Sequence, residues 1–348
     1  MIKKRATAVM VCLGMMTGLM AGSIQTVQAQ EDEREEITIA WVVDNVDISQ
    51  RNLYDTAVDY ANYLNDTRDD IHIELTLFDG TASVEKQISD IETAIAMGVD
   101  CISLASVEPE GIRPAAEAAM EAGIKVLNWR DEGDWCTVHF IAANEDKKGQ
   151  AQRDWTRQYL EENPDAVLYA GLQYGATSHP NCFPRMQYMK DLEEEFPDRF
   201  QILVEQYSDW STNTSMTMVE DWLQAYPQMN YIASASEEQM LGVIEAVKIH
   251  SSLDDFVLVT HNGEQTGIDM LKNGEVEMVV AQTFPIFAQG IIDYCVKMQM
   301  EDFTGSVDMS DYSIKVLTPE NVADYEKLIQ VDYYNNQYYE PILADSYK

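Results

Sequence analysis

The strongest constraint on the fold is an alternation of short β-branched runs with amphipathic segments, which begins at Ile37 and occurs in two successive series. In the first series, the expected strands cover residues 37–43, 71–77, 101–104, 125–127 and 139–142. Between them, apolar residues recur at helical spacing over 54–64 and 84–97. This alternation predicts β-α units around a parallel sheet.

The second series has the same character. Its expected strands cover 166–169, 201–205, 231–233, 256–260 and 277–281, and its expected helices cover 149–160, 185–195, 216–225, 240–248 and 267–272. Two successive sets of β-α units predict an α/β fold with two open, doubly wound parallel sheets. A chain of 348 residues is also long for a single hydrophobic core.

The N-terminal segment has the pattern of an export signal. Lys3, Lys4 and Arg5 precede an apolar run over 6–21, and a V-x-A pattern ends at Ala29. We therefore expect a signal peptide over 1–29 and an extracytoplasmic protein. A lipid anchor at Cys12 is an alternative, although the apolar run continues through that cysteine. The run is shorter than the ~20 residues that a membrane-spanning helix needs.

The composition is strongly acidic, with 60 Asp and Glu against 23 Lys and Arg and a formal net charge of −37. Such a surface repels polyphosphates, which argues against nucleic acid as a partner. We interpret the acidity as a solvated exterior rather than as a binding patch.

The sequence lacks the common motifs for cofactors, metals and catalysis. The sequence contains no G-x-G-x-x-G, G-K-[ST], G-x-S-x-G or H-E-x-x-H motif, and its five histidines are scattered. Cys101 and Cys295 lie in apolar patterns and are expected to be small buried hydrophobes. Cys136 and Cys182 lie in loop-like segments, and a disulfide between them stays open.

Several stretches resemble a known family. Residues 87–104 read Q-I-S-D-I-E-T-A-I-A-M-G-V-D-C-I-S-L, and residues 115–128 read A-A-E-A-A-M-E-A-G-I-K-V-L-N. Further matching segments lie at 144–149, 207–210, 236–242, 260–263, 281–283 and 321–325. In their order and spacing, these segments resemble the ribose/galactose-type periplasmic binding proteins over essentially the whole mature chain.

The resemblance implies a type I periplasmic binding protein fold with an interlobe cleft and three crossover segments. It implies an N-terminal lobe of 36–144 with 284–313 and a C-terminal lobe of 145–283 with 314–348. The implied function is capture of a sugar or polyol and its delivery to a membrane ABC permease, by a monomer. A ligand-sensing role for a membrane sensor kinase and a secreted enzyme on the same scaffold are the alternatives.

The resemblance also places ligand-binding residues. In the second lobe they fall on Arg185, Ser236, Glu237, Asn262 and Gln282. A guanidinium can engage two adjacent oxygens, and amides can both donate to and accept from hydroxyl groups. Glu237 has an alternative interpretation as the start of a helix.

The first lobe departs from the family pattern. The family's Asp-Arg pair corresponds to Arg130-Asp131, in reversed order and beside Trp129. The family's aromatic residues near the first turn are replaced by polar residues that include Asn52. The stacking platform must then come from Trp129 or Trp41, or the ligand is not an ordinary hexose or pentose. Asp209 and Trp210 are interpreted as structural. Asp209, Ser211 or Thr212 is expected to be the N-cap of the following helix.

Overall fold

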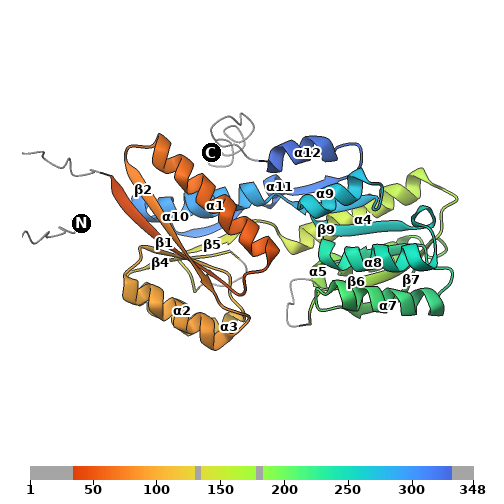
Figure 1. Cartoon of the computed structure of the whole chain (residues 1–348), viewed down its shortest axis with the longest axis horizontal. Coiled ribbons are helices and arrows are strands. Elements are labelled where there is room, and N and C mark those ends of the chain that lie inside the picture. The colour runs from red at the N-terminus through yellow and green to blue at the C-terminus, as the bar shows by residue number, and fades with distance from the viewer. Residues whose placement is uncertain (1–33, 130–134, 178–182, 331–348) are drawn as a thin grey trace, which may run out of the picture. The chain divides into compact units, whose positions relative to one another are not determined.

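The computed structural model describes residues 34–129, 135–177 and 183–330. Its strands form two six-stranded sheets, in the orders β11-β5-β4-β3-β1-β2 and β12-β10-β9-β8-β6-β7. We call the first sheet with its helices the first lobe and the second sheet with its helices the second lobe (Figure 1). All described strand pairs are parallel except β10 with β12.

The first lobe contains β1 (Glu35–Val43), α1 (Ile48–Thr67), β2 (Ile71–Asp79), α2 (Val84–Met97), β3 (Cys101–Leu104), α3 (Pro109–Glu121), β4 (Lys125–Asn128), β5 (Val138–Ile141), α10 (Phe284–Glu301) and β11 (Gly305–Asp308). Helices α1 and α10 cover one face of its sheet, and α2 and α3 cover the other (Figure 1). Each face buries its own apolar cluster, as a doubly wound sheet requires.

The second lobe contains α4 (Glu145–Glu162), β6 (Leu168–Tyr174), α5 (Phe183–Gln187), α6 (Met189–Glu195), β7 (Phe200–Tyr207), α7 (Thr212–Ala225), β8 (Tyr231–Ser234), α8 (Glu237–His250), β9 (Val257–Asn262), α9 (Gln265–Lys272), β10 (Met278–Gln282), β12 (Ile314–Leu317) and α12 (Val322–Ile329). A short helix, α11 (Ser310–Ser313), stands between β11 and β12. The chain therefore passes between the sheets after β5, after β10 and after β11.

The predicted α/β fold with two parallel sheets is confirmed, and most expected strands lie within two residues of their predicted bounds. One prediction is wrong: residues 185–195 form two helices, α5 and α6, rather than one. At the break, Gln187 Nε2 and Tyr188 Oη both donate 2.8 Å hydrogen bonds to Asp146 Oδ1 on α4. These contacts hold the break against α4.

Side-chain caps begin the helices that border the lobes' facing ends. Asp47 Oδ1 accepts from Gln50 N at 2.7 Å, and Asn144 Oδ1 accepts from Lys147 N at 3.1 Å. Ser211 caps α7 through Thr214 N, so Ser211 is the N-cap among the three residues considered. Each cap satisfies a backbone donor that the helix itself leaves without a partner.

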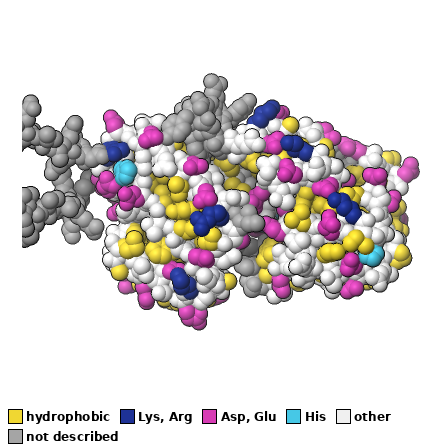
Figure 2. Space-filling model, viewed as in Figure 1, with side chains coloured by type: hydrophobic (Ala, Val, Ile, Leu, Met, Phe, Trp, Pro, Cys, Tyr) yellow, Lys and Arg dark blue, Asp and Glu magenta, His cyan; other side chains and the backbone are white. Residues whose placement is uncertain are grey.

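The acidic side chains are spread over both lobes on the face shown in Figure 2, with few Lys and Arg among them. This distribution agrees with a solvated acidic exterior. Among the residues that the structure describes, no helix combines the length and apolar character that crossing a bilayer needs.

Candidate ligand-binding site

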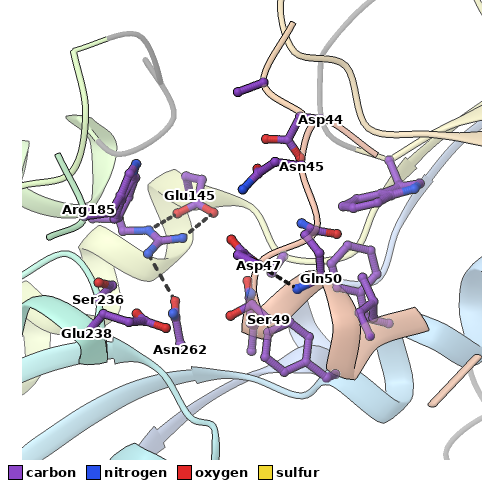
Figure 3. Close-up of a pocket in the computed structure, with 18 of the residues that line it drawn as sticks. Asp44, Asn45, Asp47, Ser49, Gln50, Glu145, Arg185, Ser236, Glu238 and Asn262 are labelled. Atoms are coloured by element: carbon purple, nitrogen blue, oxygen red, sulfur yellow. Dashed lines mark hydrogen bonds and ion pairs between the residues drawn. The ribbon is translucent and has the colours of Figure 1, made fainter. Parts of the chain in front are cut away.

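A cavity of 640 Å³ opens between the two lobes. Many of its polar lining residues lie at or just after the carboxyl ends of parallel strands (Figure 3). Asp44 follows β1 and Trp129 follows β4 in the first lobe, whereas Ser236 follows β8, and Asn262 and Gln282 end β9 and β10. Open α/β sheets bind their ligands at this edge.

Arg185 and Glu145 form the ion pair at the centre of the second-lobe wall (Figure 3). Arg185 Nε donates to Glu145 Oε2 at 2.6 Å, and Nη2 donates to Oε1 at 3.1 Å. Arg185 Nη1 donates to the carbonyl oxygen of Ala235 at 2.5 Å and to Asn262 Oδ1 at 3.3 Å. The guanidinium fork is therefore occupied by the protein, and it positions the side chains around it.

Lys148 lies behind this pair and is only 1% exposed. Its Nζ donates to Glu145 Oε1 at 2.7 Å and to Gln282 Oε1 at 2.5 Å. A buried ammonium group needs protein acceptors in place of water. The two oxygens supply acceptors of this kind for Lys148.

The two buried cations fix the orientation of two cavity amides. An ammonium or guanidinium group can only donate, so it must face the oxygen of an amide and not its nitrogen. Lys148 holds the oxygen of Gln282, and Arg185 holds the oxygen of Asn262. Gln282 Nε2 and Asn262 Nδ2 make no hydrogen bond to the residues that the structure describes, so each can donate to a ligand oxygen.

The contacts among Arg185, Glu145 and Lys148 shift the pKa values of the buried groups in this wall. Burial alone would raise the pKa of Glu145, but the charges and hydrogen bonds of Arg185 and Lys148 outweigh it and lower the pKa to about 2. Burial and the nearby Arg185 lower the pKa of Lys148 to about 8, against the opposing effect of Glu145. Burial, followed by the charges of Arg185 and Lys148, keeps the pKa of His261 well below its usual value.

The first-lobe wall is formed by the β1–α1 turn and the start of α1, and includes Asp44, Asn45, Asp47, Ser49 and Gln50 (Figure 3). Gln50 is 9% exposed, and its buried Oε1 has no hydrogen-bond partner in the described chain. An unsatisfied buried acceptor is costly unless a ligand or water donates to it. This wall therefore offers acceptors opposite the amide donors of the second lobe.

Two tryptophans line the cavity. Trp129 packs edge-on against Phe287, with ring centroids 5.1 Å apart, and its Nε1 donates to Ser103 Oγ at 3.0 Å. Trp210 lies 5.9 Å from the Arg185 guanidinium. A Cβ atom at Gly175 would come within 2.1 Å of the Trp210 ring, so glycine is needed there for the tryptophan to occupy its position.

Five of the residues predicted from the sequence line the cavity: Arg185, Ser236, Asn262, Gln282 and Trp129. Arg130 and Asp131 lie outside the described residues, as does Cys182. Trp41, the other stacking candidate, is fully buried in the first-lobe core.

Glu237 does not line the cavity. It is the first residue of α8 and is 2% exposed, and its Oε1 accepts from the backbone N of Gly263 at 2.7 Å and of Glu264 at 3.1 Å. Burial and the charge of Glu264 raise its pKa well above the usual value. The helix-start interpretation holds, and the next residue, Glu238, lines the cavity instead.

Asn52 also lies outside the cavity lining, although Ser49, Gln50 and Leu53 of the same helix line it. Its Nδ2 donates to Glu264 Oε2 in the second lobe at 2.9 Å, and Ser49 Oγ donates to Glu264 Oε1. Burial raises the pKa of Glu264, and the hydrogen bonds from Ser49 and Asn52 partly offset this.

Glu145, Lys148 and Trp210 were not predicted from the sequence to belong to the site, and neither was the first-lobe wall over 44–50. Lys148, Gln152, Thr156 and Leu160 are all buried and recur every four residues, so a lysine in this register was the available signal. Asp209 and Trp210 were interpreted as structural because they lie in a loop that leads into a helix, but both line the cavity. In the part of the chain that the structure describes, no group of His, Cys, Asp or Glu side chains is arranged to hold a metal ion.

A family model described as "Periplasmic binding protein domain" matches residues 39–300. The chain belongs to this family. The family consists of extracytoplasmic binding proteins, and the cavity between the lobes is the candidate ligand-binding site of this member. The resemblance noted in the sequence is thereby confirmed.

Individual family members are similar at low identity. A ribose import binding protein of Bacillus subtilis is 21% identical over 60% of this chain, and the match covers 66% of that protein, just under two thirds. A solute binding protein of Bacillus halodurans with bound myo-inositol has a TM-score of 0.72 at 19% identity, over 86% of this chain and 99% of that one. One from Actinobacillus succinogenes with bound D-allose has a TM-score of 0.71 at 18% identity, over 83% of this chain and all of that one.

Proposed function

We propose that this chain captures a sugar or sugar-like polar molecule in the interlobe cavity and delivers it to an ABC transporter permease. The observation that carries the proposal is the pair of amides, Gln282 and Asn262, whose oxygens are held by buried cations. Their N–H groups face a cavity of 640 Å³, a volume suited to a small ligand. A hydroxylated ring offers the acceptors that these donors need.

The family and its members support the ligand class. The solved structures named above hold myo-inositol and D-allose, and the Bacillus subtilis relative is named for ribose. Trp129 and Trp210 supply flat apolar surfaces against which a sugar ring can pack.

In this proposal, the ligand bridges two walls of opposite hydrogen-bond character. Gln282 and Asn262 donate to ligand oxygens from the second lobe, and Ser236 contributes a hydroxyl. Gln50 and Asp47 accept from ligand hydroxyls in the first lobe. Arg185 acts chiefly by holding Glu145 and Asn262 in position, because its fork is already engaged.

Delivery to the permease depends on a movement of the two lobes. Residues 36–144 with 284–313 move as one body and 145–283 with 314–348 as the other, closing on the ligand and stabilising the form that the permease recognises. The chain is exported through a signal peptide over 1–29 and acts as a monomer that binds its ligand without turnover.

A thermal-shift screen of the mature chain tests this proposal. The panel contains D-ribose, L-arabinose, D-allose, myo-inositol, sugar acids and amino acids. A ligand that binds only the native state raises the melting temperature by mass action. We expect a shift with at least one sugar or polyol, which chromatography then recovers unchanged. Shifts with amino acids alone, or consumption of the compound, would contradict the proposal.

A further inference from the structure

Two cysteines from distant parts of the chain meet in the first-lobe core. Cys101 lies in β3 and Cys295 in α10, 194 residues apart in sequence, and their Sγ atoms are 3.1 Å apart. Both side chains are fully buried. The two thiols share one apolar cluster with Trp41, Leu127 and Ile291.

We propose that Cys101 and Cys295 form a structural disulfide in the exported protein. A disulfide has an S–S length of about 2.05 Å, so the sulfurs need to approach by about 1 Å, which small rotations of two side chains can supply. The family is extracytoplasmic, and disulfides persist in oxidising compartments outside the cytoplasm. The pairing joins a strand and a helix that already pack against each other.

The surroundings favour a structural role over a reactive one. A reactive cysteine needs exposure and thiolate character. Burial raises the pKa of the Cys101 thiol well above its usual value, which suppresses the thiolate in the folded state. The bond therefore forms during folding, before the core closes, and the folded protein then protects it from reductants.

The reaction is a thiol–disulfide exchange. The thiolate of one cysteine attacks the disulfide of an extracytoplasmic oxidoreductase, or of oxidised glutathione in vitro, and gives a mixed disulfide. The second thiolate attacks the protein sulfur of that mixed disulfide and expels the carrier thiol. Two protons and two electrons leave the protein, and the carrier disulfide is reduced to two thiols.

The position of the pair gives the bond a function. Helix α10 begins directly after Thr283, where the chain returns from the second lobe, and its residues Phe284 and Phe287 line the cavity. A covalent bond from Cys295 to the central sheet fixes this helix in the first lobe. Because the closed loop is long, the bond also restricts the unfolded chain strongly. The first lobe then moves as a rigid body during closure.

Peptide mapping of the wild-type chain tests the proposal without any sugar ligand, so it can fail while the proposed function stands. The protein is refolded in reduced and oxidised glutathione, then denatured and alkylated without reductant. Trypsin places the four mature cysteines in separate peptides, 87–125, 131–147, 158–185 and 273–297. We expect peptide 87–125 linked to 273–297. Alkylation of both Cys101 and Cys295, or linkage of either to another peptide, overturns the proposal.

A stability measurement gives a second readout. Reduction of the denatured wild-type protein, followed by refolding under reductant, should lower the melting temperature by roughly 5–10 °C. The double variant Cys101→Ala/Cys295→Ala should show no difference between the two conditions. Cys136→Ala is the matched control, and it should keep the full effect of reduction. An equal effect of reduction in the double variant and the wild type would contradict the assignment.

Discussion

Asn52 Nδ2 donates a 2.9 Å hydrogen bond to Glu264 Oε2, and these two residues belong to different lobes. Ser49 Oγ donates to the other oxygen of the same carboxylate. Glu264 is 8% exposed and precedes α9, and its carboxylate reaches the start of α1 in the first lobe. A direct link between the lobes stabilises their arrangement in this structure without any ligand.

Removing this link should favour opening. We expect Glu264→Ala to lower the closed-to-open ratio of the unliganded protein by about 5- to 150-fold, since two hydrogen bonds of about 0.5–1.5 kcal/mol each are lost. Small-angle X-ray scattering should then show a larger radius of gyration. The control is Gln265→Ala, an exposed change on the next residue. An unchanged radius in Glu264→Ala, with the wild type in the closed form, would show that the carboxylate does not hold the lobes.

The loss of folding stability at low pH should depend on Glu145. Its pKa is about 2 in the folded protein and near the ordinary 4.5 in the unfolded chain, so the stabilisation is fully present above pH 4.5. It is lost as the pH falls toward 2. The free energy of unfolding of the wild type relative to Glu145→Gln should fall by up to about 3 kcal/mol between pH 6 and pH 2.

Urea unfolding at a series of pH values measures this difference. Glu161→Gln, an exposed change on the same helix, is the control and should show no pH-dependent difference from the wild type. A constant gap between wild type and Glu145→Gln from pH 6 to pH 2 would contradict the lowered pKa.

The pH dependence of folding stability above pH 8 should depend on Lys148. Its folded pKa is about 8 and its unfolded pKa near 10.5, so between these values the unfolded chain binds the extra proton. Stability contributed by this group therefore rises with pH over that window. We expect the wild type to gain up to about 3 kcal/mol relative to Lys148→Met between pH 8 and pH 10.5.

Lys148→Met should also weaken sugar binding about tenfold at pH 7, because Gln282 loses the partner that orients its amide. Chemical unfolding measures the stability difference between the wild type and Lys148→Met, and titration calorimetry measures the difference in sugar affinity. Lys190→Met, an exposed lysine in the same lobe, is the control. A flat stability difference across the alkaline window would mean that Lys148 is not the titrating group.

Ligand binding should change tryptophan fluorescence, because Trp129 and Trp210 line the cavity. We expect the change to fall by at least half in Trp210→Phe or in Trp129→Phe. Trp155→Phe is the control, since Trp155 stacks on Tyr159 outside the cavity lining. A signal that disappears only in the control would place the ligand elsewhere.

The fold could be predicted from the sequence because both sheets are buried on two faces. Buried parallel strands such as Cys101–Leu104 read as continuous apolar runs, and their helices carry one apolar face. The break at Tyr188 could not be predicted, since it depends on contacts with Asp146 from another helix.

The candidate site was predictable only in part. Asn262 and Gln282 end strands, and strand ends meet at one edge of a sheet, so their place in the cavity follows from topology. The roles of Lys148 and Glu264 depend on which distant side chains they meet, and sequence spacing does not encode this. Asn52 shows the same limit, because its side chain meets Glu264 of the other lobe instead of the cavity.

The central claim is that a sugar-like molecule binds in this cavity through Gln282. Titration calorimetry of the mature chain with the panel compound that gives the largest thermal shift tests it most directly, with Gln282→Ala measured in parallel. We predict one binding site per chain and an affinity at least about fivefold weaker in the variant, since a lost hydrogen bond to a buried ligand costs about 1–3 kcal/mol. Equal affinity in both proteins, or no binding by the wild type to any sugar or polyol tested, would contradict the account.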